Sequence, residues 1–218
     1  MARLKLGVLV SGRGSNLQAL IDAAADPAFP AEIALVLSNK ADAYGLERAR
    51  QAGIATAVVS HRDFPGDKAG FEAAMDAHLD AAGVELVCLA GFMRLLSPEF
   101  VERRRDRVIN IHPSLLPSFK GLDTHERALQ AGVRVHGCTV HYVRAEMDVG
   151  PIVVQAAVPV LPGDDAHALA DRVLAAEHRI YPLAVRLIAE GRVRVEDERV
   201  VVEGHAPDTA AVLLNPAP

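Results

Sequence analysis

An alternation that fills the first two thirds of the chain most constrains its fold. Short runs of Val, Leu and Ile, each the length of a strand, are separated by longer Ala-rich stretches with helical period. This alternation is typical of β-α-β units around a parallel sheet. The sequence therefore predicts an α/β fold with a Rossmann-like, mostly parallel central sheet flanked by helices.

The positions of these elements follow from the same pattern. The expected strands are residues 4–10, 33–38, 56–59, 84–90 and 108–111. The expected helices are residues 15–25, 43–52, 67–82, 98–105 and 124–131. The first and fourth strands, LKLGVLV and VELVCLA, are apolar almost throughout, as expected of strands covered on both faces. We expect these two strands at the centre of the sheet.

The pattern changes in the C-terminal third. Two long strand-like runs, residues 134–143 and 151–160, are joined by a segment too short for a crossover helix, so they should pair antiparallel. A long helix is expected over residues 165–190, with Leu183 on its apolar side and Pro182 kinking or splitting it.

The end of the chain predicts a closing hairpin and a tail. The hairpin spans residues 192–204, with its turn near Asp197. The Pro/Ala-rich residues 205–218 have little to bury, so we expect a loosely ordered tail there. Residues 1–204 are expected to form a single domain.

The length, charge and cysteine content of the chain limit the classes of protein to which it can belong. A chain of 218 residues, 50% of them apolar, can bury a substantial core. Its formal net charge of −5 argues against a generally basic nucleic-acid binder. Cys88 and Cys138 lie in apolar stretches without metal-ligand spacing, which favours core thiols in a reducing compartment. The apolar run ending at Val10 is too short for a signal peptide or a membrane span, so we expect a soluble cytoplasmic protein.

A glycine-containing loop follows the first expected strand. Residues 11–17, SGRGSNL, run directly into a helix, whose first N–H groups suit a phosphate. The loop is no Walker A motif, and Leu17 stands where a dinucleotide fingerprint has its third glycine. The second strand supplies no acidic residue for the ribose of NAD, so a monophosphate fits better. A plain strand-to-helix turn with Ser15 or Asn16 as N-cap is equally open at this point.

Two polar side chains end the fifth expected strand. Asn110 and His112 are two residues apart, so a strand points both to the same face. A carboxamide can donate to a developing oxyanion while an imidazole moves a proton, which is the minimum for acyl transfer. Ligands of open α/β sheets bind at the carboxyl ends of strands, so we expect both side chains near the glycine loop and residues 91–96.

Other polar residues give weaker evidence for a functional site. The position of Asp148 between the two antiparallel strands allows it to join the same edge, but a solvated turn aspartate is equally compatible with the spacing. His136 and His141 are five residues apart on a strand and face opposite sides, so we expect no shared metal. The basic run at residues 103–107 lies near a helix end and is interpreted as solvated surface.

With these residues in view, the chain resembles the phosphoribosylglycinamide formyltransferase family, the folate-dependent formyltransferases of purine synthesis. The resemblance covers residues 4–191 and rests on SGRGSNLQAL, SNKADAYGLERARQAGI, LAGFMRLLSP, INIHPSLLPSFKG, HGCTVHYV and DVGPIVVQ, in the family's order. It implies one formyltransferase domain over residues 1–204. It also implies transfer of a formyl group from the co-substrate 10-formyltetrahydrofolate to the amine of glycinamide ribonucleotide, with no metal.

The resemblance also implies residue roles. The family's catalytic positions fall on Asn110, His112 and Asp148. Its substrate-binding positions fall on Gly14, Ser15 and Asn16 at the phosphate and Glu177 at the ribose. Its folate-binding positions fall on Lys68, Met93, Arg94, Leu95, Leu96 and Asn110. We expect a monomer or homodimer with no nucleic-acid or membrane partner.

Two departures from the family's pattern lie near these positions. Val149 stands where a glycine is frequent before Gly150, which is expected to stiffen the folate loop. Asp123 stands where many members have histidine, which changes the charge near the pocket and leaves a role for His125 open.

Three alternatives accompany this interpretation. Formyltetrahydrofolate hydrolases and methionyl-tRNA formyltransferases share the Asn, His and Asp core, but they usually carry a further regulatory or nucleic-acid-binding domain for which this chain has no room. A non-catalytic nucleotide-binding domain would keep the glycine loop without needing the three polar residues together. A nicotinamide-dependent reductase is disfavoured by the loop, although Lys40 could meet an NADP phosphate.

Overall fold

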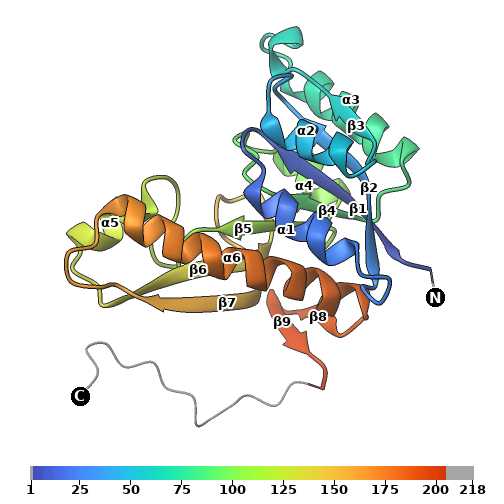
Figure 1. Ribbon diagram of the computed structural model, residues 1–218. Coiled ribbons are helices and arrows are strands. Elements are labelled where there is room, and N and C mark those ends of the chain that lie inside the picture. Colours follow the sequence, from blue (N-terminus) through green and yellow to red (C-terminus); the bar gives the residue numbers. More distant parts are fainter. Residues whose placement is uncertain (1, 205–218) are drawn as a thin grey trace. The chain divides into compact units, whose positions relative to one another are not determined.

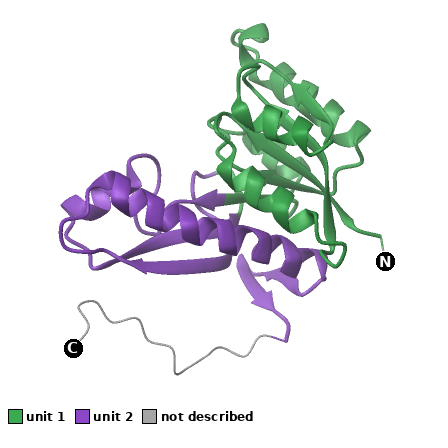
Figure 2. Ribbon diagram, viewed as in Figure 1, with its two compact units in different colours: residues 1–110, 142–145 green, residues 111–141, 146–218 purple. Residues whose placement is uncertain are grey.

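The computed structural model describes residues 2–204, so the tail predicted over residues 205–218 lies outside the described part. The chain divides into two compact units, coloured separately in Figure 2. Unit 1 comprises residues 1–110 and 142–145, and unit 2 comprises residues 111–141 and those from 146 onward. The single domain expected over residues 1–204 stays a prediction.

A parallel sheet forms the centre of unit 1. Its strand order is β3-β2-β1-β4-β5. The strands are β1 (Leu4–Val10), β2 (Ala31–Ser38), β3 (Thr56–Val58), β4 (Leu86–Leu89) and β5 (Val108–His112). All four pairings between neighbours are parallel. The prediction that β1 and β4 occupy the centre is confirmed.

Helices cover both faces of this sheet (Figure 1). They are α1 (Ser15–Ala24), α2 (Tyr44–Gln51), α3 (Lys68–Ala81) and α4 (Pro98–Arg103). On one face, Val10 meets Gly45 of α2, which packs beside α1. On the other face, a Cβ at Gly7 would lie 2.6 Å from Leu79 of α3, so this helix packs directly on β1. The apolar strands are therefore buried on both sides, as their sequences predict.

In unit 2, a long helix packs against an antiparallel pair. Strands β6 (Val135–Tyr142) and β7 (Ile152–Pro159) pair antiparallel, and α6 (Ala166–Ala189) contacts both β7 and α5 (Thr124–Gln130). The predicted hairpin consists of β8 (Val193–Glu196) and β9 (Arg199–Val202). Its turn residues Asp197 and Glu198 have φ of 47° and 58°. The predicted fold class, including the antiparallel strands and the long C-terminal helix, is confirmed.

One of the two alternatives expected for α6, a split at Pro182, is wrong, and a kink there stays a prediction. Pro182 lies inside the helix without splitting it, and helical structure continues to Ala189. Proline removes a backbone bond, but Ile180, Tyr181 and Ala184 are buried around it, and their packing holds both sides of the helix in place. Leu183, expected on the apolar side, is exposed.

The interpretation of the basic run as surface is wrong for Arg104. Its side chain is buried, and it forms ion pairs with Asp76 at 2.6 Å and Asp80 at 2.7 Å, both on α3. Its guanidinium also lies 5.7 Å from the centre of the Phe100 ring. A buried charge requires such partners. They lie on another helix, so the local sequence gives no sign of them.

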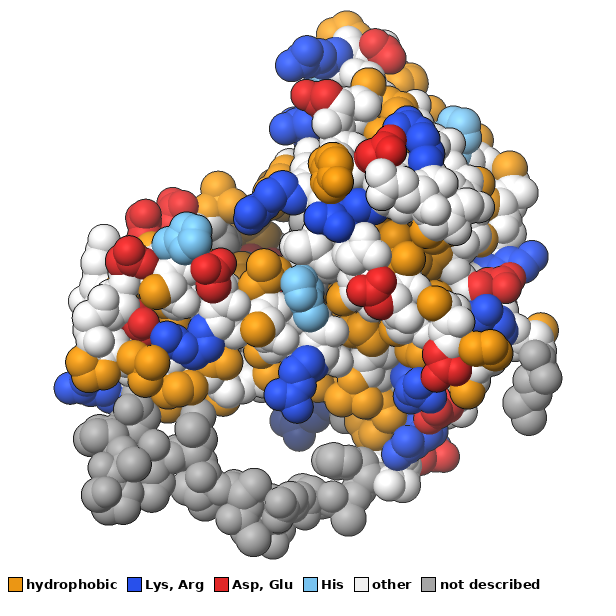
Figure 3. Space-filling view, viewed as in Figure 1, with side chains coloured by type: hydrophobic (Ala, Val, Ile, Leu, Met, Phe, Trp, Pro, Cys, Tyr) orange, Lys and Arg blue, Asp and Glu red, His pale blue; other side chains and the backbone are white. Residues whose placement is uncertain are grey.

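The outer surface and the cysteines complete the description. On the face shown in Figure 3, basic and acidic side chains are interspersed. No helix within residues 2–204 is long and apolar enough to cross a membrane. Cys88 and Cys138 are both buried and unbridged, which confirms the prediction of two core thiols.

Candidate active site

Helix α1 begins at the glycine loop without a side-chain cap. Its N-cap is Gly14, with a left-handed φ of 70°, and no side chain accepts a cap hydrogen bond. The alternative in which Ser15 or Asn16 is the N-cap is therefore wrong. A helix start of this kind favours a bound anion through its backbone N–H groups and its macrodipole.

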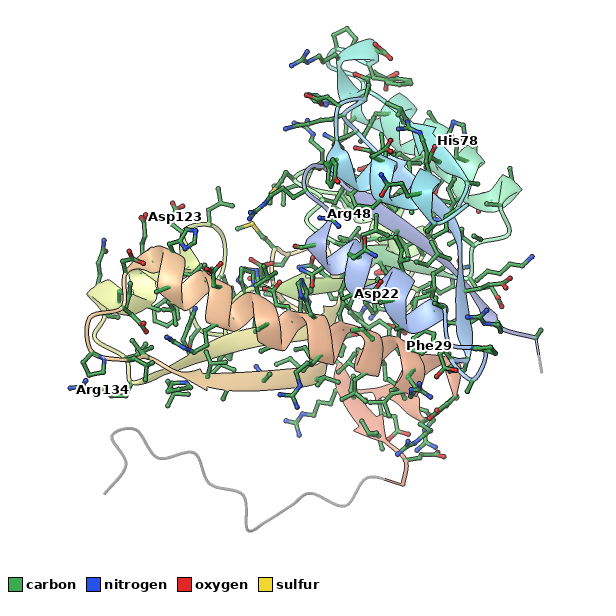
Figure 4. All side chains as sticks on the ribbon, viewed as in Figure 1. Asp22, Phe29, Arg48, His78, Asp123 and Arg134 are labelled. Atoms are coloured by element: carbon green, nitrogen blue, oxygen red, sulfur yellow. The ribbon has the colours of Figure 1, made fainter. Side chains whose placement is uncertain are left out.

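Helix α2 supports the shape of this loop. A Cβ at Gly14 would lie 2.7 Å from the Cα of Gly45, so only glycine allows this approach. Arg48, labelled in Figure 4, donates from Nε to the Arg13 carbonyl at 2.9 Å and from an Nη to Gln18 at 3.0 Å. The loop is therefore packed against α2 and has a cation beside it.

Residues 91–97 follow β4 next to the glycine loop. The Ser11 amide donates to the Gly91 carbonyl at 3.1 Å, and the Met93 amide donates to Ser11 Oγ at 2.8 Å. On the other side of β4, Asn110 lies in register with Leu89. Unit 1 thus carries the glycine loop, residues 93–96 and Asn110 at the carboxyl ends of adjacent parallel strands.

A pocket of about 170 Å³ contains two cationic side chains. Its lining includes Lys68, Arg94 and Leu95, together with Phe64 and Phe71. Lys68 and Arg94 suit an anionic ligand group, while the aromatic and aliphatic surface suits an apolar one. This pocket brings together three of the residues that the resemblance assigns to folate.

The three apolar residues of this segment that the resemblance assigns to folate differ in exposure. Met93 and Leu95 are each 68% exposed, so both offer apolar surface to a ligand. Leu96 instead packs against the core cluster that contains Leu9, Met75 and Leu79. Its side chain therefore anchors the segment to the core of unit 1.

In unit 2, His112 and Asp148 face each other. His112 Nδ1 lies 3.4 Å from Asp148 Oδ1, and the two side chains are only 7% and 11% exposed. The other carboxylate oxygen accepts a hydrogen bond of 2.7 Å from the Gly121 amide. Asp148 is therefore not a solvated turn residue: it is directed toward His112 and held by a backbone donor.

Both ring nitrogens of His112 lie near oxygen atoms that can accept hydrogen bonds. An ionised Asp148 can only accept at Nδ1, and Nε2 lies 3.1 Å from the Phe119 carbonyl, which also only accepts. Both nitrogens can donate at once only in the imidazolium.

Several residues of the loops in this part of unit 2 have left-handed backbone. Phe119, Asp123 and Asp148 are not glycine, yet their φ angles are 55°, 55° and 52°. Asp123, at the start of α5, is labelled in Figure 4. Such conformations concentrate where a loop must present a functional group.

Two further histidines lie near His112. The rings of His125 and His136 are 5.4 Å apart, edge to face, and His136 is 1% exposed. Burial is the main cause that lowers the pKa of His136 to about 4, and charge on His125 and His112 adds to it. Burial and then His112 lower the pKa of His125 as well. Both rings are therefore neutral near pH 7.

Glu177 lies on the buried face of α6. Its side chain is 6% exposed, on the same face as Val173 and Ile180. It is close enough to Cys138 to add to the burial that raises the pKa of that thiol to about 12. A buried carboxylate on an otherwise apolar face is rare without a structural or functional role.

The sequence interpretation gave no role to Ser11, Glu72 or Phe119. Ser11 and Glu72 hold residues 91–97, and Phe119 offers its carbonyl to His112. Of these three residues, only Glu72 could have been identified from the sequence. It lies three residues before Met75 and seven before Leu79, so it shares the apolar face of the helix with them. A carboxylate on such a face requires a buried partner.

The fold and this set of groups define a formyl transferase, and the chain belongs to that family. The sequence model of the formyl transferase family matches residues 4–185. The chain is 45% identical over 202 residues to phosphoribosylglycinamide formyltransferase of Haemophilus influenzae, covering 93% of this chain and 95% of that one. The family resemblance identified from the sequence motifs is confirmed.

A solved structure and a longer relative extend this comparison. The crystal structure of glycinamide ribonucleotide transformylase 1 from Symbiobacterium toebii is similar, with a TM-score of 0.89, 50% identity, and coverage of 92% of this chain and 94% of that one. The trifunctional purine biosynthetic protein adenosine-3 of Drosophila pseudoobscura pseudoobscura is 55% identical over 194 residues. This match covers 88% of this chain but only 14% of that protein.

Proposed function

We propose that this chain transfers a formyl group from 10-formyltetrahydrofolate to the amine of glycinamide ribonucleotide, a step of purine synthesis. The observation that carries the proposal is the buried pair of His112 and Asp148 in a chain of the formyl transferase family. Two relatives that match nearly the whole chain carry the names of this activity.

The substrate nucleotide is bound by its phosphate at the start of α1. Gly14, Ser15 and Asn16 present the helix N-terminus to it, and Arg48 adds a nearby positive charge. The Glu177 carboxylate accepts hydrogen bonds from the ribose hydroxyls. A bound phosphate would accept from the backbone N–H groups that no side chain caps at the start of α1. It would bind there although the net charge of the chain is negative.

The folate is bound by residues of the pocket in unit 1. Lys68 and Arg94 pair with its carboxylates, and Leu95 and Met93 cover apolar parts of it. Phe64, Phe71 and Leu95 give the pocket apolar surface, and His61 and Asp67 also line it. A mixed lining of this kind suits a ligand that joins aromatic rings to polar and acidic groups.

Catalysis stabilises a tetrahedral intermediate. The amine of glycinamide ribonucleotide attacks the formyl carbon, and the developing oxyanion accepts from the Asn110 amide and the His112 imidazolium. Asp148 orients His112 and stabilises its charge. The bond between the formyl carbon and the folate nitrogen then breaks, while the amine loses a proton and the folate nitrogen gains one.

The neutral rings of His125 and His136 support a positive charge on His112 in this step. A cation on His125 or His136 would repel the His112 imidazolium, but the lowered pKa of each ring keeps it uncharged near pH 7. Asn110 and His112 meet the charge of the oxyanion, so the proposed step uses no metal ion. A cytoplasmic location and a monomeric or homodimeric state stay predictions.

Acceptor competition tests the proposal. The purified protein is incubated with 10-formyltetrahydrofolate and either water alone, glycinamide ribonucleotide or initiator methionyl-tRNA, and release of tetrahydrofolate is followed. We expect turnover only with glycinamide ribonucleotide, and almost none in the His112→Ala variant. Equal turnover with water alone would instead assign the chain as a hydrolase.

A further inference from the structure

We propose that Ser11 and Glu72 are positioning residues that fix the two ends of the folate-binding segment, residues 91–97. This inference rests on the proposed function only in naming folate as the ligand. The anchoring contacts themselves are properties of unit 1.

The middle of the segment cannot set its own shape. Residues 91–97 form neither helix nor strand, and Met93 and Leu95 are largely exposed. Exposed side chains on irregular backbone restrict it little. The positions of Arg94 and Leu95 in the pocket therefore depend on what holds the segment at its ends and on Leu96, which packs against the core.

Ser11 holds the first end. Its Oγ accepts from the Met93 amide at 2.8 Å and donates to Asn39 Oδ1 at 2.6 Å, while its own amide donates to the Gly91 carbonyl. Ser11 and Asn39 are both buried at the ends of neighbouring strands. The hydroxyl is thereby oriented, with its proton committed to Asn39 and a lone pair directed at Met93.

Glu72 holds the other end. Its side chain is 2% exposed, and its Oε1 accepts from the Ser97 amide at 2.6 Å while its Oε2 accepts from the Ser97 hydroxyl. Ser97 in turn caps α4 by accepting from the Phe100 amide at 3.1 Å. The carboxylate therefore binds the residue that ends the segment and begins the helix, where a negative charge is favourable.

The anchor and the pocket share one rigid element. Lys68 and Glu72 lie one turn apart on α3, and Lys68 lines the pocket that also contains Arg94 and Leu95. Through Ser97, Glu72 fixes the distance between α3 and the segment. The two sides of the pocket are thus held together before a ligand arrives, and such preorganisation strengthens binding.

Binding of tetrahydrofolate to the full chain, measured by titration calorimetry, tests this role. Glu72→Ala and Ser11→Ala should each weaken binding about tenfold or more, because the segment loses one fixed end. The KM for glycinamide ribonucleotide should change much less. Glu72→Gln should bind nearly as the wild type does, since its amide oxygen can accept from the Ser97 amide and its NH₂ can donate to the hydroxyl.

Matched controls separate positioning from general stability. Asp76→Ala removes a carboxylate one turn further along α3, and this carboxylate pairs with Arg103 and Arg104, which lie outside the segment. Ser38→Ala removes a buried hydroxyl at the end of β2 that accepts a hydrogen bond from the Lys40 amide at 3.1 Å. Both should bind tetrahydrofolate as the wild type does.

Several results would overturn the inference. Wild-type affinity in folded Glu72→Ala and Ser11→Ala would do so, and so would an equal loss in Asp76→Ala. If Glu72→Ala does not fold, Ser11→Ala and the hydrogen exchange of residues 91–97 decide: faster exchange than in Ser38→Ala supports the anchor, and equal exchange refutes it. A wild-type chain that binds tetrahydrofolate without transferring formyl would contradict the proposed function alone.

Discussion

At the residue scale, Asp148 gives the sharpest prediction, because its buried carboxylate lies 3.4 Å from Nδ1 of His112. Asp148→Asn keeps the shape and removes the charge, so kcat should fall by about a hundredfold with a small change in KM. Steady-state kinetics measure this.

The chain contains a matched control for that substitution. His167 and Asp171 form the same pair of groups at 3.2 Å, but on the exposed surface of α6. Asp171→Asn should leave kcat unchanged, because exposed pairs contribute little. Equal kcat in Asp148→Asn and the wild type would remove Asp148 from the mechanism.

Asn110 should act on the transition state. Loss of one oxyanion donor typically costs a factor of about 10² to 10³ in kcat, so Asn110→Ala should fall in that range. Thermal unfolding of the variant checks that the fold is intact. A folded variant within a few fold of wild-type kcat would show that another group stabilises the oxyanion.

His136 predicts a pH dependence of stability. Its pKa is about 4 in the folded chain against 6.5 as the ordinary value, so the unfolded chain binds its proton first as pH falls. Stability from this residue is fully present above pH 6.5 and decreases down to about pH 4, by at most about 1.4 kcal/mol per pH unit. His125 acts in the same direction.

Urea unfolding between pH 7 and pH 5 measures this slope. His136→Phe keeps an aromatic ring next to His125 and Phe119 and removes the titrating group. The variant should therefore lose less stability per pH unit than the wild type. Identical slopes would show that other groups cause the dependence.

At the scale of elements, the close approach of the glycine loop to α2 gives a prediction. Gly14→Ala combines a left-handed φ with a Cβ only 2.7 Å from Gly45, so the start of α1 must shift. We expect the KM for glycinamide ribonucleotide to rise about tenfold or more, because the phosphate donors move with it.

Gly53 supplies the control for Gly14. Its φ is 71°, nearly that of Gly14, but a Cβ there would meet no atom within 4 Å. Gly53→Ala therefore carries the same backbone strain without displacing a neighbour, and its KM should match the wild type. An equal rise of the KM in both variants would show that backbone strain, and not the loop contact, controls substrate binding, and a wild-type KM in Gly14→Ala would contradict the prediction.

Elements were predictable from the sequence where local pattern determines them. In unit 1, the strands and helices expected from the sequence occur in the observed order. A central strand that is buried on both faces is apolar almost throughout, so its sequence alone identifies it. The continuity of α6 through Pro182 and the burial of Arg104 were not predictable. Each depends on packing partners far away in the sequence.

At the scale of the whole molecule, the same distinction separates the parts of the candidate site. Asn110 and His112 were identifiable because a spacing of two residues puts them on one face of a strand. The sequence motifs also showed the resemblance to a family. Ser11 and Glu72 act on residues 82 and 25 positions away along the chain. Such pairs follow only from the folded structure.

The central claim concerns the destination of one carbon atom. The wild-type chain is incubated with 10-formyltetrahydrofolate labelled with ¹³C in the formyl group and with glycinamide ribonucleotide, and the products are analysed by mass spectrometry. The account predicts labelled formyl on the nucleotide in equal amount to the tetrahydrofolate released. Labelled formate with unmodified nucleotide would contradict it.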